Sequence, residues 1–486
     1  MEIGGAILKG YAWNVIVKWF TRALGLINTI IIVRILSPFD LGVMALSTFV
    51  IMFFLAMAQM GGRDYIFKTP NITEAEISSV WSLQLLINSL IALAIFIFSP
   101  QISIFMARPE LESVLKILCI IPIMNALQSP GLLIAEKQMD FSLSAKVLLF
   151  SKFVTVPVTI FLAFQLQNYW CLVFGTLSGS FCEVVLSYFF TRYKVSLTLK
   201  QIGQVWKTTR WIFISSVTGY LRAKLELVIV NSKFGAEGAG LYSTSAEFAH
   251  LPITEIVYPV TKPLTAGIAK NTDSKPLVFQ QLMKYLSISY LILMPSVFGI
   301  YIIADLFVPI VMGDKWLDAI PVFKAISLMM LIFTSYGACR IFLMLYNDLK
   351  LVVLADISTV ILVIFILGAE FIKSLAFFAE LRFGIGVLYI LFLLILIKKR
   401  HNVAIASYFQ VLLTNLIYPI PMFLILSMFR SQLNLTNAVE FVVLVFFGAI
   451  IFTLTIYLIL FKSSVNNFCM EFQRGFIQNI MSKIKR

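Results

Sequence analysis

Apolar segments of about twenty residues alternate with short polar segments along the whole chain. A helix of that length spans the hydrocarbon core of a bilayer. The pattern predicts fourteen transmembrane helices, with approximate limits 11–33, 41–62, 79–104, 113–134, 144–165, 169–190, 210–232, 240–261, 285–308, 321–345, 350–369, 375–397, 408–429 and 438–461. Prolines interrupt the fourth span (Pro122, Pro130) and the eighth (Pro252, Pro259).

The composition agrees with this pattern. Of the 486 residues, 60% are hydrophobic and 13% are charged, whereas soluble domains have about 45–50% apolar and about 25% charged residues. The longest polar segments, 191–210 and 262–284, are short loops, so we expect no separate soluble domain. The first apolar run is too long and too charged for a cleaved signal peptide. The expected fold class is an all-α polytopic membrane protein.

Lysine and arginine residues fix the orientation of the predicted spans. With the N-terminus in the cytoplasm, 23 of the 38 cations fall in cytoplasmic segments and 6 in external ones. Cytoplasmic loops carry such an excess of Lys and Arg. We therefore expect both termini in the cytoplasm, and we attribute the net charge of +14 mostly to topology. It does not indicate a nucleic-acid partner.

No residue pattern indicates catalysis or a bound cofactor. The five cysteines are scattered and have neither disulfide nor zinc spacing: Cys119, Cys171, Cys182, Cys339 and Cys469. P-loop, HExxH and GxSxG motifs are absent from the sequence. We expect no catalytic residue, no metal site and no cofactor.

A weak internal repeat divides the chain. Residues 31–47 (IIVRILSPFDLGVMALS) resemble residues 228–245 (VIVNSKFGAEGAGLYSTS), and Gly42 aligns with Gly240 at an offset of 198. Six spans separate the copies. An even number gives both halves the same orientation, related by a pseudo-two-fold axis along the membrane normal.

The repeat predicts two six-helix bundles and two additional C-terminal helices. The expected domain limits are 1–200, 201–400, 401–461 and a basic tail, 462–486. In the tail, Phe468, Phe472, Phe476, Ile480 and Ile484 recur every four residues. This spacing is typical of an amphipathic helix on the anionic cytoplasmic leaflet, and a frayed basic tail is the alternative.

The first span carries a polar stripe. Asn14, Lys18, Arg22, Gly25 and Thr29 follow one another at helical spacing. Arg22 lies at the centre of the span, roughly 16 Å from either end, which is too deep for easy snorkelling. A cation at that depth costs at least roughly 2.5–3.5 kcal/mol.

Other spans add further charge. The central cations are Lys18, Arg22, Lys152, Arg222, Lys224 and Arg340, and the candidate ion-coupling or gating residues are Glu183, Glu226, Glu247, His250 and Asp356. Cations outnumber acids, which indicates a water-filled cavity for an anionic passenger. Arginine suits phosphate because its guanidinium donates two hydrogen bonds at once.

Structural roles remain open for most of these residues. Arg222 and Glu226 could form a local i,i+4 pair, and Glu380 and Arg382 a pair at the outer rim of the membrane. Lys18 and Lys224 could extend to the headgroups, and His250 could be a buried histidine with its hydrogen bonds satisfied. A purely structural role is hardest to sustain for Arg22 and Lys152, because no acid lies within a turn of either on its own helix.

The motifs RILSPFDLG and GLYSTSAEFAHLPITEIVYPV resemble the Wzx-type polysaccharide flippases of the multidrug/oligosaccharidyl-lipid/polysaccharide exporter superfamily. The resemblance covers at least residues 1–400. It implies transport of undecaprenyl-pyrophosphate-linked oligosaccharide repeat units from the cytoplasmic to the outer leaflet of the bacterial plasma membrane. It also implies alternating access, with Lys18, Arg22, Lys152 and Arg222 serving the cavity, and a product that is exopolysaccharide, capsule or O-antigen.

The implied partners are this lipid-linked oligosaccharide, membrane lipids, and a polysaccharide polymerase and glycosyltransferases. A drug or metabolite antiporter of the same superfamily is the alternative. Such exporters typically centre on carboxylates, but the first span has no acid between Glu2 and Asp40. A polytopic glycosyltransferase or polymerase needs large polar loops, which the predicted external segments lack.

Overall fold

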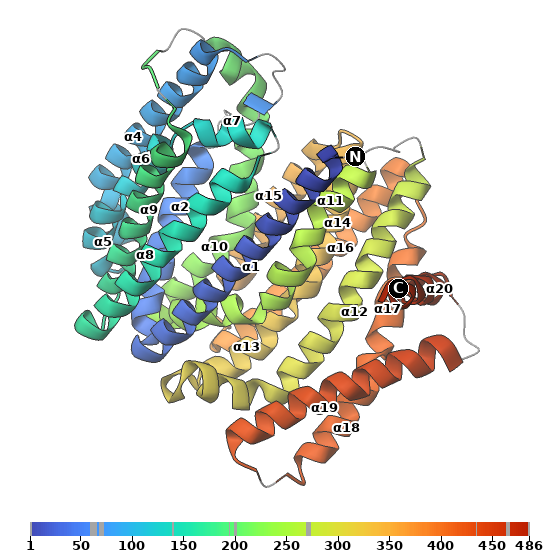
Figure 1. Ribbon diagram of the computed structural model, residues 1–486. Coiled ribbons are helices and arrows are strands. Elements are labelled where there is room, and N and C mark those ends of the chain that lie inside the picture. The colour runs from blue at the N-terminus through green and yellow to red at the C-terminus, as the bar shows by residue number, and fades with distance from the viewer. Residues whose placement is uncertain are drawn as a thin grey trace. The chain divides into compact units, whose positions relative to one another are not determined.

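Among the residues that the computed structural model describes, all regular structure is helical (Figure 1). The described residues are 2–58, 66–67, 72–138, 140–193, 195–198, 202–268, 274–433, 435–462 and 467–484. Helices satisfy their own backbone hydrogen bonds, which the apolar core of a bilayer demands. The all-helical class predicted from the sequence is confirmed for these residues.

Short segments connect most of the helices along the chain. They are α1 (Glu2–Ile35), α2 (Pro38–Ala58), α4 (Glu74–Phe105), α5 (Glu110–Leu118), α6 (Ile120–Leu127), α7 (Gly131–Lys137), α8 (Ser142–Leu166), α9 (Trp170–Thr191), α10 (Ile202–Ala249), α11 (Tyr258–Ile268), α12 (Lys275–Phe307), α13 (Ala319–Ser327), α14 (Met329–Leu345), α15 (Leu349–Leu367), α16 (Leu375–His401), α17 (Ala406–Ile417), α18 (Pro419–Arg430), α19 (Asn437–Tyr457) and α20 (Phe468–Ile484). Short π- or 3₁₀-helical turns adjoin them: η1 (Ile253–Val257), η2 (Val308–Met312), η3 (Asp314–Trp316) and η4 (Leu458–Lys462).

Ten helical segments of the described chain are long and apolar enough to span a membrane, and an eleventh follows if α5 to α7 form one bent span. The first, seventh and eighth predicted spans lie on α1, on α10 and on the segment from α10 to α11, which are not among the ten. The multi-pass membrane character is therefore established. The total of fourteen and the two six-helix bundles stay predictions.

Both proline-interrupted spans are irregular. The fourth breaks between α6 and α7, where Gln128 is extended (φ −55°, ψ 144°) and Pro130 precedes the next helix, and the two parts differ in direction by 52°. The eighth contains the π-helical turn η1 directly after Pro252. Proline removes a backbone donor and clashes with the preceding turn, which accounts for both irregularities.

The chain forms two compact units, Met1–Gly240 and Leu241–Arg486. In the first unit, α8 packs against both α1 and α9. Gly175 and Gly179 of α9 face the side chains of Thr159 and Thr155 of α8. Small residues spaced by four let two membrane helices approach closely. The two glycines therefore allow the backbones of α8 and α9 to lie close together.

The repeat glycines meet in the first unit. A Cβ atom added to Gly42 would lie 2.6 Å from the carbonyl carbon of Ala236 and 3.0 Å from the nitrogen of Gly240. A Cβ atom on Gly240 would lie 2.7 Å from the carbonyl carbon of Pro38 and 2.9 Å from the nitrogen of Gly42. The offset of 198 that relates Gly42 to Gly240 also relates Pro38 to Ala236. The two contacts are therefore exchanged by the repeat, as in an isologous interface.

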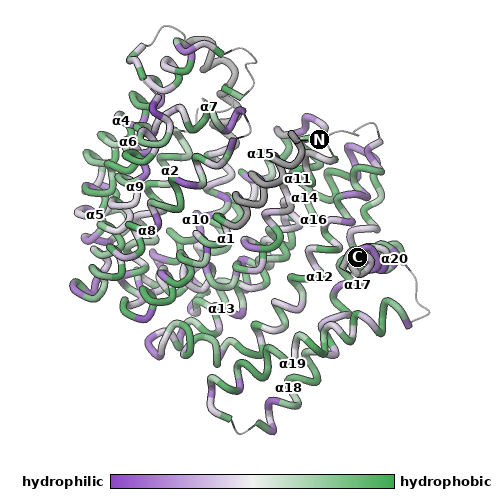
Figure 2. The backbone as a smooth tube through the Cα atoms, in the orientation of Figure 1, coloured by the Kyte–Doolittle hydropathy of each residue, from purple (hydrophilic) through white to green (hydrophobic). Residues whose placement is uncertain are grey.

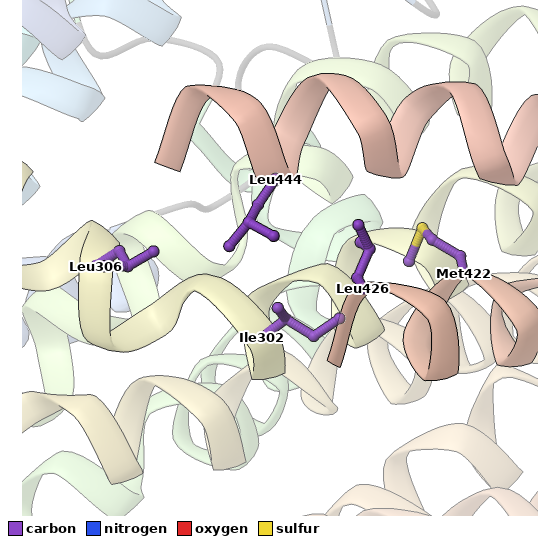
Figure 3. Packing of buried hydrophobic residues seen from close by; sticks show 5 residues of the cluster. All are labelled: Ile302, Leu306, Met422, Leu426 and Leu444. Atoms are coloured by element: carbon purple, nitrogen blue, oxygen red, sulfur yellow. The ribbon is translucent and has the colours of Figure 1, made fainter. Parts of the chain in front are cut away.

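The second unit is centred on α12, which contacts α13, α14, α17, α18 and α19. Ile302 and Leu306 of α12 pack with Met422 and Leu426 of α18 and with Leu444 of α19 (Figure 3). Figure 2 shows α18 and α19 as hydrophobic along most of their length. In the apolar stretch of the segment Asn437–Lys462, which contains α19, only 11% of the residues are buried. We attribute this exposed apolar surface to contact with lipid.

Arg430 holds the ends of these helices together. Its guanidinium donates to both carboxylate oxygens of Asp305 on α12 (3.0 and 2.6 Å) and to Glu440 on α19 (2.9 Å). It also donates to the backbone oxygen of Ile302 at 2.6 Å. A forked guanidinium suits such a junction because it donates in several fixed directions.

The C-terminal helix α20 docks through a buried polar cluster. Gln473 accepts a hydrogen bond from the hydroxyl of Tyr418 (2.7 Å) and donates to the side-chain oxygen of Asn415 (3.0 Å). The Cys469 thiol lies 3.0 Å from the hydroxyl of Ser287 on α12. The buried face of α20 thus includes Cys469 and Gln473, while Phe476 of the predicted apolar stripe is exposed. The placement of this helix on a membrane surface stays a prediction.

Candidate functional site

The first-span cation Arg22 lies in the middle of α1, half-buried, where α1 packs along α8. The rings of Phe20 and Phe153, 6.0 Å apart, belong to this contact. Thr21 beside it donates back to the backbone oxygen of Val17 at 2.9 Å and is buried. Lys18 is on the same helix, and its side chain lies outside the described residues.

Lys152 of α8 lies close enough to Glu183 of α9 to act on it electrostatically. Glu183 also accepts hydrogen bonds from Gln128 (3.1 Å) and Ser151 (3.4 Å). The acid that lies near Lys152 therefore comes from the neighbouring helix. The spacing of residues along one helix could not predict this pairing, because Lys152 lies on α8 and Glu183 on α9.

The two α10 cations differ in their surroundings. Arg222 and Glu226 are both buried, at 8% and 6% exposure, one turn apart on α10. Lys224, which lies between them in the sequence, is exposed. This arrangement is compatible with the local i,i+4 pair that the sequence left open.

In the second unit, two tyrosines connect Arg340 with Asp356. Arg340 of α14 approaches the hydroxyl of Tyr336 at 3.4 Å, and the rings of Tyr336 and Tyr389 are 5.6 Å apart. The hydroxyl of Tyr389 donates to Asp356 of α15 at 2.6 Å. Arg382, two turns before Tyr389 on α16, is buried at 2% exposure. The structure thus connects Arg340 and Asp356 through two tyrosines, of which Tyr336 shares a span with Arg340 and Tyr389 was not singled out from the sequence.

The remaining candidates lie near the break after α10. Glu247 is exposed. His250 sits immediately after α10 and its ring packs edge-on against Phe333, with centroids 5.2 Å apart. Within the described residues, no cluster of three or more His, Cys, Asp or Glu side chains is arranged to hold a metal ion.

Each unit therefore contains basic and acidic side chains within its apolar helices. Arg22, Lys152 and Glu183 lie on α1, α8 and α9 of the first unit, and Arg340 and Asp356 belong to the second. Ionisable groups at such positions pair or face water, because an isolated charge in hydrocarbon is costly. Such residues mark a candidate functional site in each unit.

Comparison with known proteins shows the family of this chain. The profile of the polysaccharide biosynthesis protein family matches residues 31–321, more than half of the chain. The chain belongs to this family. The resemblance to the Wzx-type flippases expected from its motifs is confirmed.

Similar proteins cover most of the chain. An uncharacterized membrane protein in the cps region of Klebsiella pneumoniae is 24% identical over 473 residues, with 93% of this chain and 94% of that protein covered. The lipopolysaccharide biosynthesis protein WzxC of Escherichia coli is 23% identical over 337 residues, 67% of each chain.

A solved structure of the lipid II flippase MurJ in an inward closed conformation has the same fold. The TM-score is 0.76 at 16% identity, with 92% of this chain and 98% of that chain covered. At this identity the likeness shows the fold alone.

Proposed function

We propose that this protein is a flippase that moves undecaprenyl-pyrophosphate-linked oligosaccharide repeat units from the cytoplasmic to the outer leaflet of the bacterial inner membrane. The observation that carries the proposal is the family match over residues 31–321, together with a half-buried arginine at the centre of α1. The names of the relatives support surface-polysaccharide synthesis, and the fold of a lipid flippase supports a lipid-linked passenger.

The proposed mechanism assigns the pyrophosphate to the cations. Arg22 offers two parallel donors to phosphate oxygens, and Lys18 extends the same helical stripe by one turn. Lys152, Arg222, Lys224 and Arg340 add positive charge along the path, while the lipid tail stays in the membrane. Because charged groups in low dielectric attract strongly, a few such cations offset the loss of hydration of the pyrophosphate.

The acids balance this charge during the transport cycle. Glu183 offsets part of the positive charge of Lys152. The proposed coupling or gating groups are Glu183, Glu226, Glu247, His250 and Asp356. Fourteen spans with both termini in the cytoplasm are part of the proposal, supported by the 23-to-6 bias of the cations. Two six-helix bundles are supported by the reciprocal contacts of Gly42 and Gly240.

The proposal is tested in the native host with this gene deleted. Undecaprenyl-pyrophosphate-linked oligosaccharide is extracted from the membranes and quantified, with the deletion complemented by the wild type, by Arg22→Gln or by Arg34→Gln. Arg34 is the matched control, because it is an exposed arginine at the end of the same helix. We expect the intermediate to accumulate in the deletion, to be cleared by wild type and Arg34→Gln, and to persist with well-expressed Arg22→Gln.

Two results would contradict the proposal in different ways. If no intermediate accumulates and the deletion becomes sensitive to drugs, the antiporter reading replaces the flippase. If the intermediate accumulates but Arg22→Gln clears it as the wild type does, the passenger is correct and the role of Arg22 is wrong.

A further inference from the structure

A cavity of about 360 Å³ lies inside the first unit, where α4, α8 and α9 meet the break between α6 and α7. Its volume falls in the range of small-molecule sites, roughly 300–1,000 Å³. It far exceeds the space that one proton or one monovalent cation needs. The cavity is therefore large enough for an organic ligand of one ring.

The helix break gives the cavity a polar wall. Non-helical backbone at membrane depth is tolerated where it is buried in protein or lines a water-filled cavity, and broken helices mark binding sites in transporters. Here the extended residue Gln128 is held in place from two sides. The indole of Trp81 donates to its backbone oxygen at 3.2 Å, and its side-chain amide donates to Glu183 at 3.1 Å.

The side chains that line the cavity have the chemistry of sugar recognition. Gln84, Asn125 and Gln128 are carboxamides, each with donors and an acceptor, and planar polar groups of this kind bind neighbouring hydroxyls of a pyranose. Trp81 adds an aromatic ring with an apolar face for the C–H side of a sugar. Asn125 is exposed, so the ligand can reach the cavity from outside the unit.

The charge of the lining selects among sugars. Glu136 and Glu183 are carboxylates, and no Lys or Arg lines the cavity in the described residues. An anionic sugar or a phosphate would meet like charge there, whereas hydroxyls donate to carboxylates well. The lining thus favours a neutral or amino-bearing sugar and disfavours a uronic acid.

We propose that this cavity is a carbohydrate subsite that binds one neutral or amino-bearing sugar ring of the transported glycan. The assignment rests on the proposed function, to which it adds a place for the glycan. Lys152, one of the proposed cations, acts on Glu183 of the lining but does not itself line the cavity. The lining includes the first turns of α4 and of α8, which under the proposed topology lie at the cytoplasmic side. The glycan therefore enters the subsite before the translocation step.

Saturation-transfer NMR on the full chain in lipid nanodiscs tests the subsite. The probes are free glucose, galactose, mannose, rhamnose and N-acetylglucosamine, with glucuronate and galacturonate as anionic counterparts. We compare the wild type with Gln84→Leu, with Asn125→Ala, and with Gln101→Leu. Gln101→Leu is the matched control, because Gln101 is an exposed glutamine on the same helix α4 and does not line the cavity.

We expect at least one neutral sugar to give a signal with the wild type and with Gln101→Leu, and both uronates to give none. We expect that signal to fall about tenfold or more in Gln84→Leu and in Asn125→Ala, the latter at an exposed position that tolerates truncation. Uronate binding equal to that of the neutral sugars, or no sugar signal with a folded wild type, overturns the proposal. So does a signal unchanged by both variants.

Failure of the subsite and failure of the flippase proposal are distinguishable. Arg22→Gln is expected to keep the sugar signal while losing clearance of the lipid-linked intermediate. If the wild type clears the intermediate in the host but binds no sugar in nanodiscs, the flippase stands and the subsite is refuted.

Discussion

Replacing Gly42 by alanine tests the closest backbone contact in the first unit. The new Cβ atom would lie 2.6 Å from the carbonyl carbon of Ala236 and closer still to its oxygen. Ordinary contact begins at 3.4 Å, so α2 and the facing turn of α10 must separate by at least 0.8 Å. The neighbouring atoms are backbone, and a side-chain rotation cannot relieve the clash. Overpacking of this kind costs typically about 1–3 kcal/mol.

The matched control has the opposite sign. Gly299 lies in the interior of α12, and a Cβ atom there meets nothing within 4 Å. Alanine in a helix is favoured over glycine by about 0.5–1 kcal/mol. We therefore expect Gly42→Ala to lower the melting temperature of the detergent-purified protein by several degrees and Gly299→Ala to leave it unchanged or raise it.

The double variant sharpens the test. Gly240→Ala should be as damaging as Gly42→Ala, because its Cβ atom meets the carbonyl of Pro38 in the reciprocal contact. Once one methyl group has separated the segments, the second needs less room. The loss of stability in the double variant should therefore be smaller than the sum of the losses in the two single variants. Two results would refute the close reciprocal contact. One is that Gly42→Ala and Gly299→Ala change the melting temperature by the same amount. The other is that the double variant loses as much stability as the two single variants together.

Two further predictions concern the second unit. Arg430→Met removes the donors to Asp305 and should cost about 1–2 kcal/mol, discounted because the site is partly exposed; an unchanged melting temperature would contradict this. Burial raises the pKa of the Cys469 thiol, because the ionised thiolate is disfavoured where α20 is docked. With the other four cysteines replaced by alanine, we therefore expect slow maleimide labelling at pH 7. Labelling should accelerate as the pH rises towards the ordinary thiol pKa and beyond, because ionisation of the thiol disfavours docking of α20. Gln473→Leu should release α20 and speed the labelling at pH 7, and equal rates in both proteins would show that Gln473 does not hold the helix.

Hydrophobic pattern was a good guide to the helices, because a bilayer rewards apolar length directly. It also located the irregularities of the fourth and eighth spans, at Pro130 and Pro252, because proline removes a backbone donor. Proline alone does not decide the outcome, since Pro157 and Pro295 lie inside the unbroken helices α8 and α12. The aligned glycines pointed to a repeat for a tertiary reason. Gly42 and Gly240 are places where another backbone approaches, and that approach excludes any side chain.

Partners of buried polar groups could not be predicted in the same way. Glu183 near Lys152, and Tyr389 on Asp356, come from different helices, and nothing in the spacing along one helix encodes that pairing. The docking face of α20 shows the same limit. Periodic phenylalanines pointed to one face, but Gln473 is buried because Tyr418 and other polar groups on neighbouring helices satisfy it.

The two proposed sites in the first unit have opposite electrostatic character, and that difference has a consequence for transport. In these proposals Arg22 on α1 attracts phosphate, while the cavity, lined by Glu136 and Glu183, disfavours phosphate and accepts hydroxyls. Helix α8 contributes to the cavity lining and packs against α1, so this one helix adjoins both proposed sites. A lipid-linked glycan has its phosphate at one end and its neutral sugars at the other, so this polarity favours a single orientation of the passenger. Orientation by opposite charge requires no recognition of individual sugar stereochemistry, and it explains how one binding surface can accept a repeat unit of several residues.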